Sequence, residues 1–340
     1  MGGRIVTARV AVFGRIPASG LEVLHQVAEV WSWDDDEHIP DDVRNRELAT
    51  AHAAVTLLTN KVDDAFLDAA PSLKIVANVA VGFNNIDVAA CARRGVVVTN
   101  TPGVLADATA DLAMALILMV TRRMAEGERL IRSGEPWAWG MFMMLGTGIQ
   151  GRQLGIIGMG GIGEALAARA RAFGMRVVYH NRRPVAPEVA AHLDAERLEL
   201  EELLATSDVV SVNCPYNADT HHLIDAGALA SMKSSAFLVN TARGPIVPDR
   251  ALYRALKEGW IAGAALDDIE EEPAKIRDWQ PESPLFQLDN VIVTPHAAYY
   301  SEESVRLVRT IAANEVVRVL TGQRPRSPVN VVDDAERDSA

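Results

Sequence analysis

Three ionisable residues, Arg243, Glu272 and His296, each come shortly after an apolar run that is predicted to be a β-strand. The runs are Phe237–Asn240, Gly263–Leu266 and Val291–Thr294. Ligands of open parallel sheets bind at the carboxyl ends of the strands. Taken singly, such an Arg is usually a surface ion-pair partner, such a Glu is usually solvated, and a His next to Pro is usually an ordinary loop residue. Three of them at one predicted edge instead favour a shared reactive site.

Together these side chains suit the interconversion of a 2-oxo acid and a 2-hydroxy acid. The planar guanidinium of Arg243 can hold carboxylate and carbonyl oxygens through paired hydrogen bonds. The imidazole of His296 can give a proton to the carbonyl oxygen as a hydride reaches the carbon, and can remove it in the reverse direction. The Glu272 carboxylate, on the far ring nitrogen, would fix the tautomer of the imidazole. The hydride itself requires a nicotinamide cofactor.

A glycine-rich turn predicts where that cofactor binds. The apolar run Leu154–Ile157 leads into the turn, a helical pattern follows, and a second strand is predicted at Met175–His180. A G-x-G-x-x-G sequence alone is common, but strand, turn, helix and strand in this order are typical of a dinucleotide-binding unit. Free N–H groups at the start of the helix would face the pyrophosphate. The predicted cofactor-binding residues of the turn are Gly158, Gly160, Gly161, Ile162 and Gly163.

The second strand ends in Tyr179-His180-Asn181-Arg182-Arg183, which bears on the choice between NAD(H) and NADP(H). An NAD-specific site of this type has an acidic residue at about position 181, where it binds the ribose hydroxyls. A neutral amide and two guanidiniums suit the extra phosphate of NADP(H) instead. The alternative is that both arginines are solvated loop residues. We therefore expect Asn181, Arg182 and Arg183 to bind the cofactor, with NADP(H) preferred and NAD(H) as a second option.

Alternating apolar runs and helical patterns predict an α/β protein with two doubly wound parallel sheets. Residues 1–103 and 297–332 are expected to form a flavodoxin-like substrate domain, and 104–296 a Rossmann-like dinucleotide-binding domain. Residues 333–340 are expected to be a disordered tail. The expected strands of the first domain are Arg9–Phe13, Ala53–Leu58, Ile75–Val79 and Val96–Thr99. Those of the second are Leu154–Ile157, Met175–His180, Asp208–Asn213, Ala236–Asn240, Gly263–Leu266 and Val291–Thr294.

A long helix is expected from about Leu105 to Arg132, and a final helix from about Ser301 to Leu320 is expected to pack on the first domain. The segment Ser133–Gly151 carries large apolar side chains, namely Trp137, Trp139, Met141, Phe142, Met143 and Met144. We expect this segment to be a packed arm or subunit contact. A loop that contacts the substrate is the alternative, and both hold if the arm reaches the active site of a partner.

The composition excludes several classes of function. The chain has 33 Lys and Arg against 45 Asp and Glu, a net charge of −12, which argues against a nucleic-acid partner. Its two cysteines, Cys91 and Cys214, cannot build a disulfide framework, and no metal-ligand spacing is present, so we expect no metal and a reducing cytoplasm. The N-terminus lacks an apolar signal core, and the most apolar run, Leu112–Val120, is too short to cross a membrane.

The motifs around these residues resemble those of the D-isomer-specific 2-hydroxyacid dehydrogenases, from about residue 50 to residue 330. The matching motifs are Val81-Gly82-Phe83-Asn84-Asn85-Ile86-Asp87, Asn100-Thr101-Pro102-Gly103, Ala108-Thr109-Ala110-Asp111, the glycine-rich turn, Val239-Asn240-Thr241-Ala242-Arg243-Gly244, Glu271-Glu272-Pro273 and Thr294-Pro295-His296. The resemblance implies that Arg243, Glu272 and His296 are catalytic. It also implies that Arg243, His296 and the backbone of Val81 and Gly82 bind the substrate. The cofactor site would further be lined by Thr109, Cys214, Pro215, Thr241, Ala242, Asp267, His296 and Ala298.

Two branches of this family compete. The first half of the chain resembles glyoxylate/hydroxypyruvate reductases, whereas His221-His222-Leu223-Ile224 and residues 294–302 look like the C-terminal-binding proteins, which are dinucleotide-sensing corepressors. Ala298 stands where many members have Gly, and Asp267-Asp268-Ile269 departs from the commoner Asp-Val-Phe. We expect a homodimeric enzyme that reduces glyoxylate or hydroxypyruvate. A dinucleotide-regulated binding protein is the alternative, and phosphite or formate oxidation is less favoured.

Overall fold

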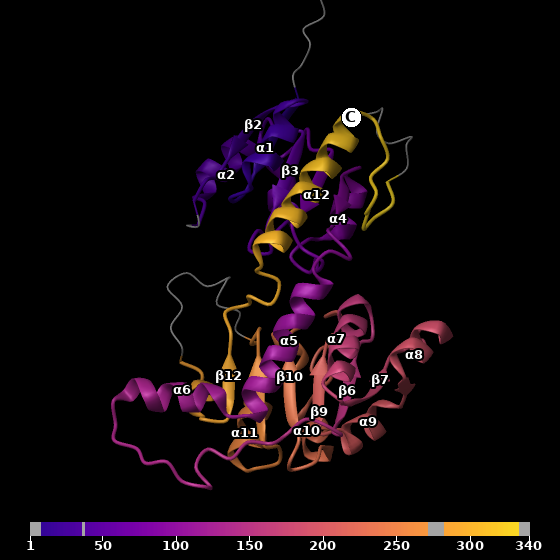
Figure 1. Ribbon diagram of the computed structural model, residues 1–340. Helices are drawn as coiled ribbons and strands as arrows, with labels where there is room; N and C mark the ends of the chain where they lie inside the picture. Colours follow the sequence, from indigo (N-terminus) through magenta and orange to yellow (C-terminus); the bar gives the residue numbers. More distant parts are fainter. Residues whose placement is uncertain (1–7, 36–37, 271–281, 333–340) are drawn as a thin grey trace, which may run out of the picture. The chain divides into compact units, whose positions relative to one another are not determined.

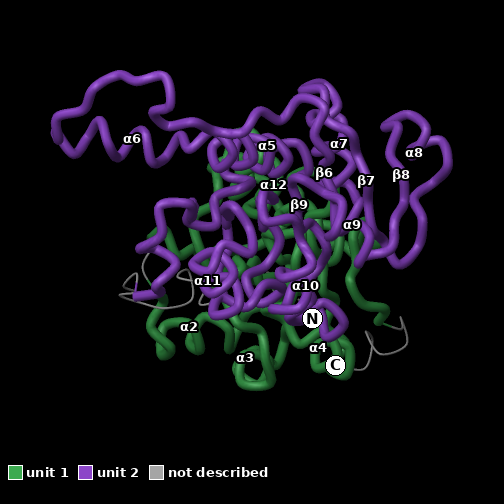
Figure 2. The backbone as a smooth tube through the Cα atoms, turned by 90° about the horizontal axis from the view of Figure 1, so that it is seen from below, with its two compact units in different colours: residues 1–105, 301–340 green, residues 106–300 purple. Residues whose placement is uncertain are grey.

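The computed structural model describes residues 8–35, 38–270 and 282–332, and the chain divides into two compact units (Figures 1 and 2). Unit 1 comprises residues 1–105 and 301–340, green in Figure 2, and unit 2 comprises residues 106–300, purple in Figure 2. Each unit has its own parallel sheet, which confirms the expected α/β class with two sheets. The expected tail at 333–340 lies outside the described residues.

Unit 1 is built on a five-stranded parallel sheet in the order β2-β1-β3-β4-β5, which is the flavodoxin-like order. The strands are β1 Ala8–Val12, β2 Ala28–Ser32, β3 Ala53–Thr56, β4 Ile75–Asn78 and β5 Val97–Thr99. The first four helices are α1 Ala18–His25, α2 Asp41–Leu48, α3 Asp64–Asp68 and α4 Val88–Arg93. The inner strands are buried on both faces and so appear in the sequence as apolar runs. The edge strand β2 is only partly buried, and the sequence does not predict it.

The chain returns to unit 1 through α12, Glu302–Leu320, which packs against α1, β3 and β4 (Figure 1). The two helices approach closely at Gly20 of α1, where an added Cβ atom would lie 3.8 Å from the Arg309 carbonyl oxygen of α12. Helix α12, the last of the described helices, therefore belongs to the same compact unit as α1.

Beyond α12, residues 326–330 run along the edge strand β5. The Val329 N–H donates to the Val98 carbonyl at 2.8 Å. The Asn330 side chain accepts from the Val98 N–H and donates to the Val96 carbonyl, both at 2.8 Å. These bonds satisfy backbone groups that an exposed strand edge would leave open to pairing with another chain. The C-terminal segment therefore covers one edge of the unit 1 sheet.

Unit 2 is built on a seven-stranded parallel sheet in the order β12-β11-β10-β9-β6-β7-β8. The strands are β6 Gln153–Ile157, β7 Arg176–His180, β8 Ala195–Arg197, β9 Val209–Val212, β10 Phe237–Asn240, β11 Gly263–Leu266 and β12 Val291–Val293. The helices are α5 Ala106–Thr121, α6 Met124–Ser133, α7 Gly161–Ala172, α8 Pro187–Leu193, α9 Leu200–Thr206, α10 Ala226–Ser231 and α11 Asp249–Lys257. The strand order reverses between β6 and β9, and nucleotides bind at the carboxyl ends of strands at such a switch point. The sequence does not predict the short edge strand β8, because two of its three side chains are exposed.

The prediction of one long helix over residues 105–132 is wrong. Helix α5 ends and α6 begins on either side of a break in which Arg123 has a left-handed conformation, with φ of 54°. The Thr121 carbonyl accepts a hydrogen bond from the Thr147 N–H at 2.7 Å instead of from a helical N–H. Gly146 packs on the same group, since an added Cβ atom there would lie 2.7 Å from the Thr121 carbonyl oxygen. Residues 146 and 147, which are distant from the break in the sequence, stabilise it. The helical periodicity of residues 105–132 therefore could not predict the break.

Residues 124–148, which we call the arm, comprise α6 and the segment that follows it. The arm projects away from the rest of unit 2 in both views (Figures 1 and 2), and α6 has no buried residue. Its exposed large apolar side chains are Met124, Ile131, Trp137, Trp139, Met141, Phe142 and Leu145. No helix in the described part of the chain is both long and apolar enough to span a lipid bilayer.

Candidate active site

The glycine-rich turn follows β6 at the switch point of the unit 2 sheet, and two of its spaced glycines, Gly158 and Gly163, have a steric reason within the chain. Gly158 has φ of 96°, and an added Cβ atom there would lie 2.5 Å from the Cys214 backbone nitrogen after β9. An added Cβ atom at Gly163 would lie 2.5 Å from the Gly158 carbonyl oxygen. Around Gly160, by contrast, no neighbouring group of the described chain comes within 4 Å of an added Cβ atom. The turn is therefore packed at its two ends and open in the middle.

The start of α7 at this turn is suited to binding an anion. Gly160 is the N-cap residue, so no side chain caps the helix, and the first N–H groups of an α-helix have no carbonyl partner one turn earlier. These N–H groups and the positive end of the helix dipole bind phosphate well. The first turn of α5 lies alongside, because an added Cβ atom at Gly161 would be 3.8 Å from the Ala106 Cβ. Thr109 is buried in that turn of α5. This cradle fits the pyrophosphate of a dinucleotide.

The loop directly after β7 carries Asn181, Arg182 and Arg183. The Asn181 side-chain amide forms hydrogen bonds with the backbone of the glycine-rich turn. Its Oδ1 accepts from the Met159 N–H at 2.6 Å, and its Nδ2 donates to the Met159 carbonyl at 3.1 Å. Arg182 and Arg183 are exposed, and Arg182 pairs with Asp219 at 3.3 Å. An exposed ion pair of this kind contributes little. Asn181 thus supports the glycine-rich turn, while the two arginines project from the loop.

A third guanidinium, which the sequence analysis did not predict, lies beside these residues. The register of β7 and β8 pairs Arg197 with Tyr179. The Arg197 Nε and Nη2 atoms donate to the Asn181 carbonyl at 3.3 and 3.1 Å, and its Nη1 pairs with Glu199 at 3.4 Å. Because β8 itself gives little signal in the sequence, nothing marks Arg197 as a neighbour of the loop after β7. Three cationic groups therefore gather at this end of the two strands.

The loops after β9 and β10 carry the other predicted cofactor residues of this edge. Cys214 and Pro215 follow β9, and burial raises the pKa of the Cys214 thiol to about 11, so it is protonated at neutral pH. Thr241 follows β10, is buried, and its hydroxyl donates to Asn213 Oδ1 at 3.4 Å. These side chains lie at the same edge of the sheet as the glycine-rich turn, because the strands are parallel.

Arg243 stands in a loop that is held from two sides. The Asn240 side chain accepts from the Ala242 N–H and donates to the Arg243 carbonyl, both at 3.0 Å. On the other side, the backbone of Gly244 packs directly against the loop after β11, and an added Cβ atom there would overlap the Ile269 carbonyl group. The partly buried Arg243 side chain donates from Nη1 to the Ala242 carbonyl at 2.7 Å. Only glycine fits after Arg243 without separating these two loops.

His296 stands in the loop after β12, and this loop is built around the buried carboxylate of Asp267. That carboxylate accepts from the Thr294 hydroxyl at 2.7 Å, the Ala297 N–H at 2.9 Å and the Ala298 N–H at 2.8 Å. The backbone N–H of His296 donates to the backbone carbonyl of Asp267 at 2.8 Å. These bonds hold His296 at φ of 52°, which is uncommon for a residue other than glycine. Asp267 and Ala298, both predicted as cofactor residues, thus shape the loop that presents His296.

A second buried carboxylate, Asp268, lies next to His296, with its Oδ2 atom 3.8 Å from the imidazole Nδ1. In the sequence Asp268 is only a departure from the family pattern, and no spacing rule relates it to His296. The predicted imidazole partner, Glu272, lies outside the described residues, as does the motif around it. Glu270, the last described residue before this gap, pairs with His222 at 3.3 Å.

The other predicted substrate contacts, Val81 and Gly82, follow β4 in unit 1. The Val81 carbonyl accepts from the Asn100 side chain at 2.8 Å, and the Gly82 carbonyl accepts from the Asn78 side chain at 2.9 Å. Neither the Val81 nor the Gly82 N–H donates a hydrogen bond to any group in the described part of the chain. Successive backbone N–H groups of this kind are suited to bind an anionic oxygen.

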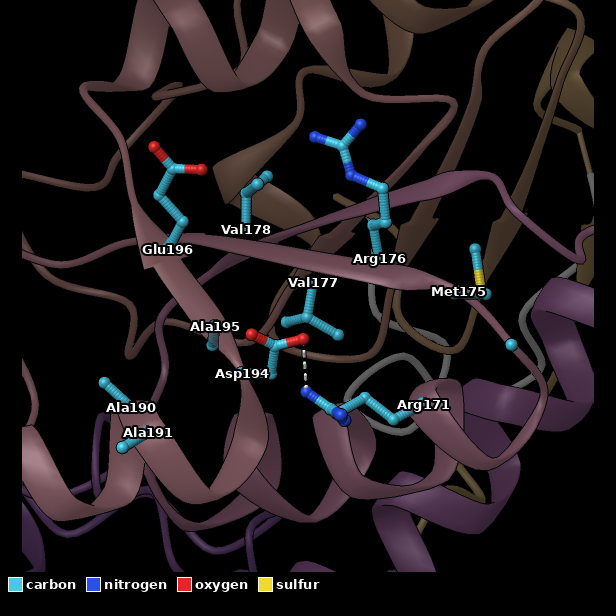
Figure 3. A pocket seen from close by; sticks show the side chains of 11 residues that line it. Arg171, Met175, Arg176, Val177, Val178, Ala190, Ala191, Asp194, Ala195 and Glu196 are labelled. Atoms are coloured by element: carbon cyan, nitrogen blue, oxygen red, sulfur yellow. Dashed lines mark ion pairs between the residues drawn. The ribbon is translucent and has the colours of Figure 1, made fainter.

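A cavity of about 520 Å³ in unit 2 is separate from these loops. It is lined by α7, β7, α8 and β8, and Arg171 and Asp194 pair within it at 3.0 Å (Figure 3). The cavity includes Arg176, the first residue of β7, and so lies at the beginning of that strand. The residues described above instead follow the ends of strands, so this cavity is not part of the candidate site.

Comparison with known proteins identifies the family to which this fold and these motifs belong. Residues 114–298 match the NAD binding domain of the D-isomer specific 2-hydroxyacid dehydrogenases. The chain belongs to this family. The resemblance carried by the sequence motifs is thereby confirmed, and this 2-hydroxyacid dehydrogenase is an oxidoreductase that uses a nicotinamide cofactor.

Relatives of this dehydrogenase include the glyoxylate reductase of Thermococcus litoralis, which is 42% identical over 327 residues that cover 95% of this chain and 96% of the relative. A glyoxylate reductase structure from Paecilomyes thermophila matches with a TM-score of 0.85 at 30% identity, covering 96% of this chain and 99% of that one. A further match is an NADPH-dependent glyoxylate/hydroxypyruvate reductase from Sinorhizobium meliloti, solved in complex with NADP and malonate. Its TM-score is 0.78 at 29% identity, and the match covers 95% of this chain and 97% of that one.

The packing of Gly244 predicts that Gly244→Ala impairs this dehydrogenase. The added methyl group displaces the Arg243 loop from the loop after β11, and a misplacement of about 1 Å lowers catalytic efficiency by roughly 100-fold. The measurement is kcat/KM for 2-oxo acid reduction, together with the thermal unfolding midpoint. Gly148→Ala is the matched control, because an added Cβ atom there has no neighbour within 4 Å in the described chain. Unchanged kcat/KM in Gly244→Ala would show that this contact does not position Arg243.

Proposed function

We propose that this protein reduces a small 2-oxo acid, glyoxylate or hydroxypyruvate, to the 2-hydroxy acid with NADPH. The observation that carries the proposal is the set of interlocked loops at the carboxyl ends of β10, β11 and β12. The loop after β10 bears Arg243, the loop after β12 bears His296, and Asp267 after β11 holds the His296 loop. The 42% identical glyoxylate reductase supports the substrate class. In this proposal unit 1 is the substrate-binding domain and unit 2 the dinucleotide-binding domain.

Each candidate residue has one task in the proposed reaction. Arg243 holds the carboxylate and carbonyl oxygens of the substrate through its guanidinium, and the Val81 and Gly82 N–H groups bind the carboxylate. His296 donates a proton to the carbonyl oxygen during reduction and takes it back during oxidation. Glu272 fixes the tautomer of His296 by accepting a hydrogen bond from the imidazole. The reduced nicotinamide, when bound, supplies the hydride.

The direct test is oxidation of NADPH with a panel of 2-oxo acids that includes glyoxylate, hydroxypyruvate and pyruvate. We expect turnover with glyoxylate or hydroxypyruvate, and His296→Ala is expected to lower kcat by roughly 10²- to 10⁴-fold because the general acid is lost. His192→Ala, at an exposed histidine of α8, is the control. Full activity in His296→Ala would reject the mechanism. No turnover with any acid, and none with phosphite or formate, would favour a dinucleotide-regulated binding protein.

We propose further that NADP(H) is preferred over NAD(H). Asn181 stands where an NAD-specific site has a carboxylate, so the loop after β7 does not repel a 2′-phosphate. Arg182, Arg183 and Arg197 supply guanidinium groups that suit a phosphate. The ion pair of Arg182 with Asp219 is exposed and weak, so it does not prevent this contact.

The cofactor preference is tested with the double variant Arg182→Ala and Arg183→Ala. Loss of charge-assisted hydrogen bonds is expected to raise KM for NADPH by roughly 10- to 100-fold, since each contributes about 1.5–3 kcal/mol. KM for NADH is expected to stay the same, because NADH has no 2′-phosphate. Arg176→Ala, an exposed arginine at the other end of the same strand, is the control. Equal or better catalytic efficiency of the wild-type protein with NADH would overturn the proposal.

We also propose that the protein is a homodimer and that the arm forms its subunit contact. Trp139 is 82% exposed and Phe142 is 79% exposed, and they belong to a group of seven large apolar side chains along the arm. Soluble monomers rarely expose a large continuous apolar patch. A second copy of the chain is the partner we favour, because twofold homodimers are the commonest oligomers.

Light scattering coupled to size-exclusion chromatography tests the subunit contact. We expect a dimer for the wild-type chain and a monomer for the double variant Trp139→Asp and Phe142→Asp, because two carboxylates oppose burial of the arm. Both side chains are exposed within the chain, so the circular dichroism spectrum is expected to be unchanged. Leu307→Asp, at an exposed leucine of α12, is the control and is expected to remain dimeric. A wild-type monomer, or a dimeric double variant, would contradict the proposal.

A further inference from the structure

The loop 80–83 after β4 in unit 1 is asymmetric in its hydrogen bonding. All four of its carbonyl groups accept hydrogen bonds, from the Thr101 N–H, the Asn100 side chain, the Asn78 side chain and the Ile86 N–H, at 2.8 to 3.0 Å. In the described part of the chain, the N–H groups of residues 81, 82 and 83 donate none. The loop therefore directs its carbonyl groups at donors of the protein, while the N–H groups of residues 81, 82 and 83 have no acceptor in the described part of the chain.

The planarity of the peptide bond explains how two asparagines control this asymmetry. In a trans peptide the carbonyl of one residue and the N–H of the next point in opposite directions and rotate together. Asn100, by donating to the Val81 carbonyl, therefore orients the Gly82 N–H. Asn78, by donating to the Gly82 carbonyl, orients the Phe83 N–H.

Asn78 is held in place by a buried polar network. It is completely buried at the end of β4, and its Oδ1 accepts from the Thr56 hydroxyl at 3.1 Å and from the Asn85 amide at 3.3 Å. The Asn85 amide also donates to the Asn60 carbonyl at 2.9 Å. Rotating the Asn78 amide would leave buried polar groups without partners, so its donor is directed at the Gly82 carbonyl.

Asn100 is held by the C-terminal segment, which is distant in the sequence. The Ser327 hydroxyl donates to the Asn100 carbonyl at 2.8 Å, and the Asn100 N–H donates to the Ser327 carbonyl at 3.3 Å. The Asn100 side chain reaches the Val81 carbonyl from this fixed backbone at 2.8 Å. The segment that covers the edge of β5 thus also anchors the donor that orients the loop.

We propose that Asn100 and Asn78 are positioning residues for the carboxylate of the substrate: Asn100 directs the Gly82 N–H at it, and Asn78 directs the Phe83 N–H, a donor additional to the Val81 and Gly82 N–H groups of the proposed function. The inference rests on the proposed function and deepens it, because it says what makes this backbone an anion-binding surface. Without these donors, a carbonyl dipole of the same loop can rotate toward the carboxylate and repel it. The two amides act on binding of the acid and not on proton or hydride transfer.

Asn100→Ala is the principal test. Loss of one orienting hydrogen bond is expected to raise KM for glyoxylate, and Kd for the non-reacting dianion oxalate, roughly threefold to tenfold. We expect kcat and KM for NADPH to stay unchanged, because the interaction lost is the same in the ground state and the transition state. Asn84→Ala is the matched control, since this exposed asparagine directly after the loop makes no side-chain hydrogen bond in the described chain.

The outcomes separate this inference from the function on which it rests. If the wild-type protein reduces no 2-oxo acid, the proposed function fails, and oxalate affinity alone then decides whether Asn100 orients an anion site. Wild-type oxalate affinity and wild-type KM in Asn100→Ala would overturn the inference. If Asn100→Ala does not fold, Ser327→Ala replaces it. That variant frees the Asn100 carbonyl and is expected to raise both constants by a smaller factor, and no rise would again overturn the inference.

Discussion

The buried carboxylate of Asp267 is the interaction on which the His296 loop depends. It accepts one hydroxyl and two backbone N–H groups, and its own backbone carbonyl accepts the N–H of His296. The Asp267 carboxylate and the Ala298 N–H are buried, and a buried polar group left without its partner costs about 1–3 kcal/mol, so the loop has one favoured arrangement. This explains how a histidine is kept in a left-handed backbone conformation at the edge of the sheet.

The same construction recurs at the other loops of the candidate site. Asn240 at the end of β10 holds the Arg243 loop, Asn78 at the end of β4 holds the Gly82 loop, and Asn181 after β7 holds the glycine-rich turn. In each case a polar side chain on or just beyond a strand engages the backbone of a loop. Apolar packing supplies the stable strand but is not directional, whereas a hydrogen bond sets direction as well as distance. The sheets therefore place the loops, and these amides and carboxylates orient them.

The family likeness extends over 95% of the chain and favours the glyoxylate reductase branch over the C-terminal-binding-protein branch. The glyoxylate reductase of Thermococcus litoralis aligns with 95% of the chain, including the C-terminal half that carries features like those of C-terminal-binding proteins. Of those features, His221 and His222 lie outside the hydrogen bonds that hold Arg243 and His296, whereas residues 294–302 include the Thr294, Ala297 and Ala298 donors that hold the His296 loop. Asp268 is a different kind of departure, because it adds a buried carboxylate 3.8 Å from the His296 imidazole.

The amino-acid order alone gives the fold class, the inner strands and the placement of Arg243 and His296 after strands of one sheet, because buried parallel strands leave apolar runs and the glycine-rich turn has a recognisable spacing. It did not predict the half-exposed strands β2 and β8, or the break after α5, which depends on Gly146 and Thr147. Which groups hold the loops follows from the packed structure and not from the amino-acid order: Asp267 holds the His296 loop, Asn240 holds the Arg243 loop and Asn100 holds the Val81 carbonyl. These bonds join groups that meet only when strands, loops and the C-terminal segment have packed, so no local pattern in the sequence records them.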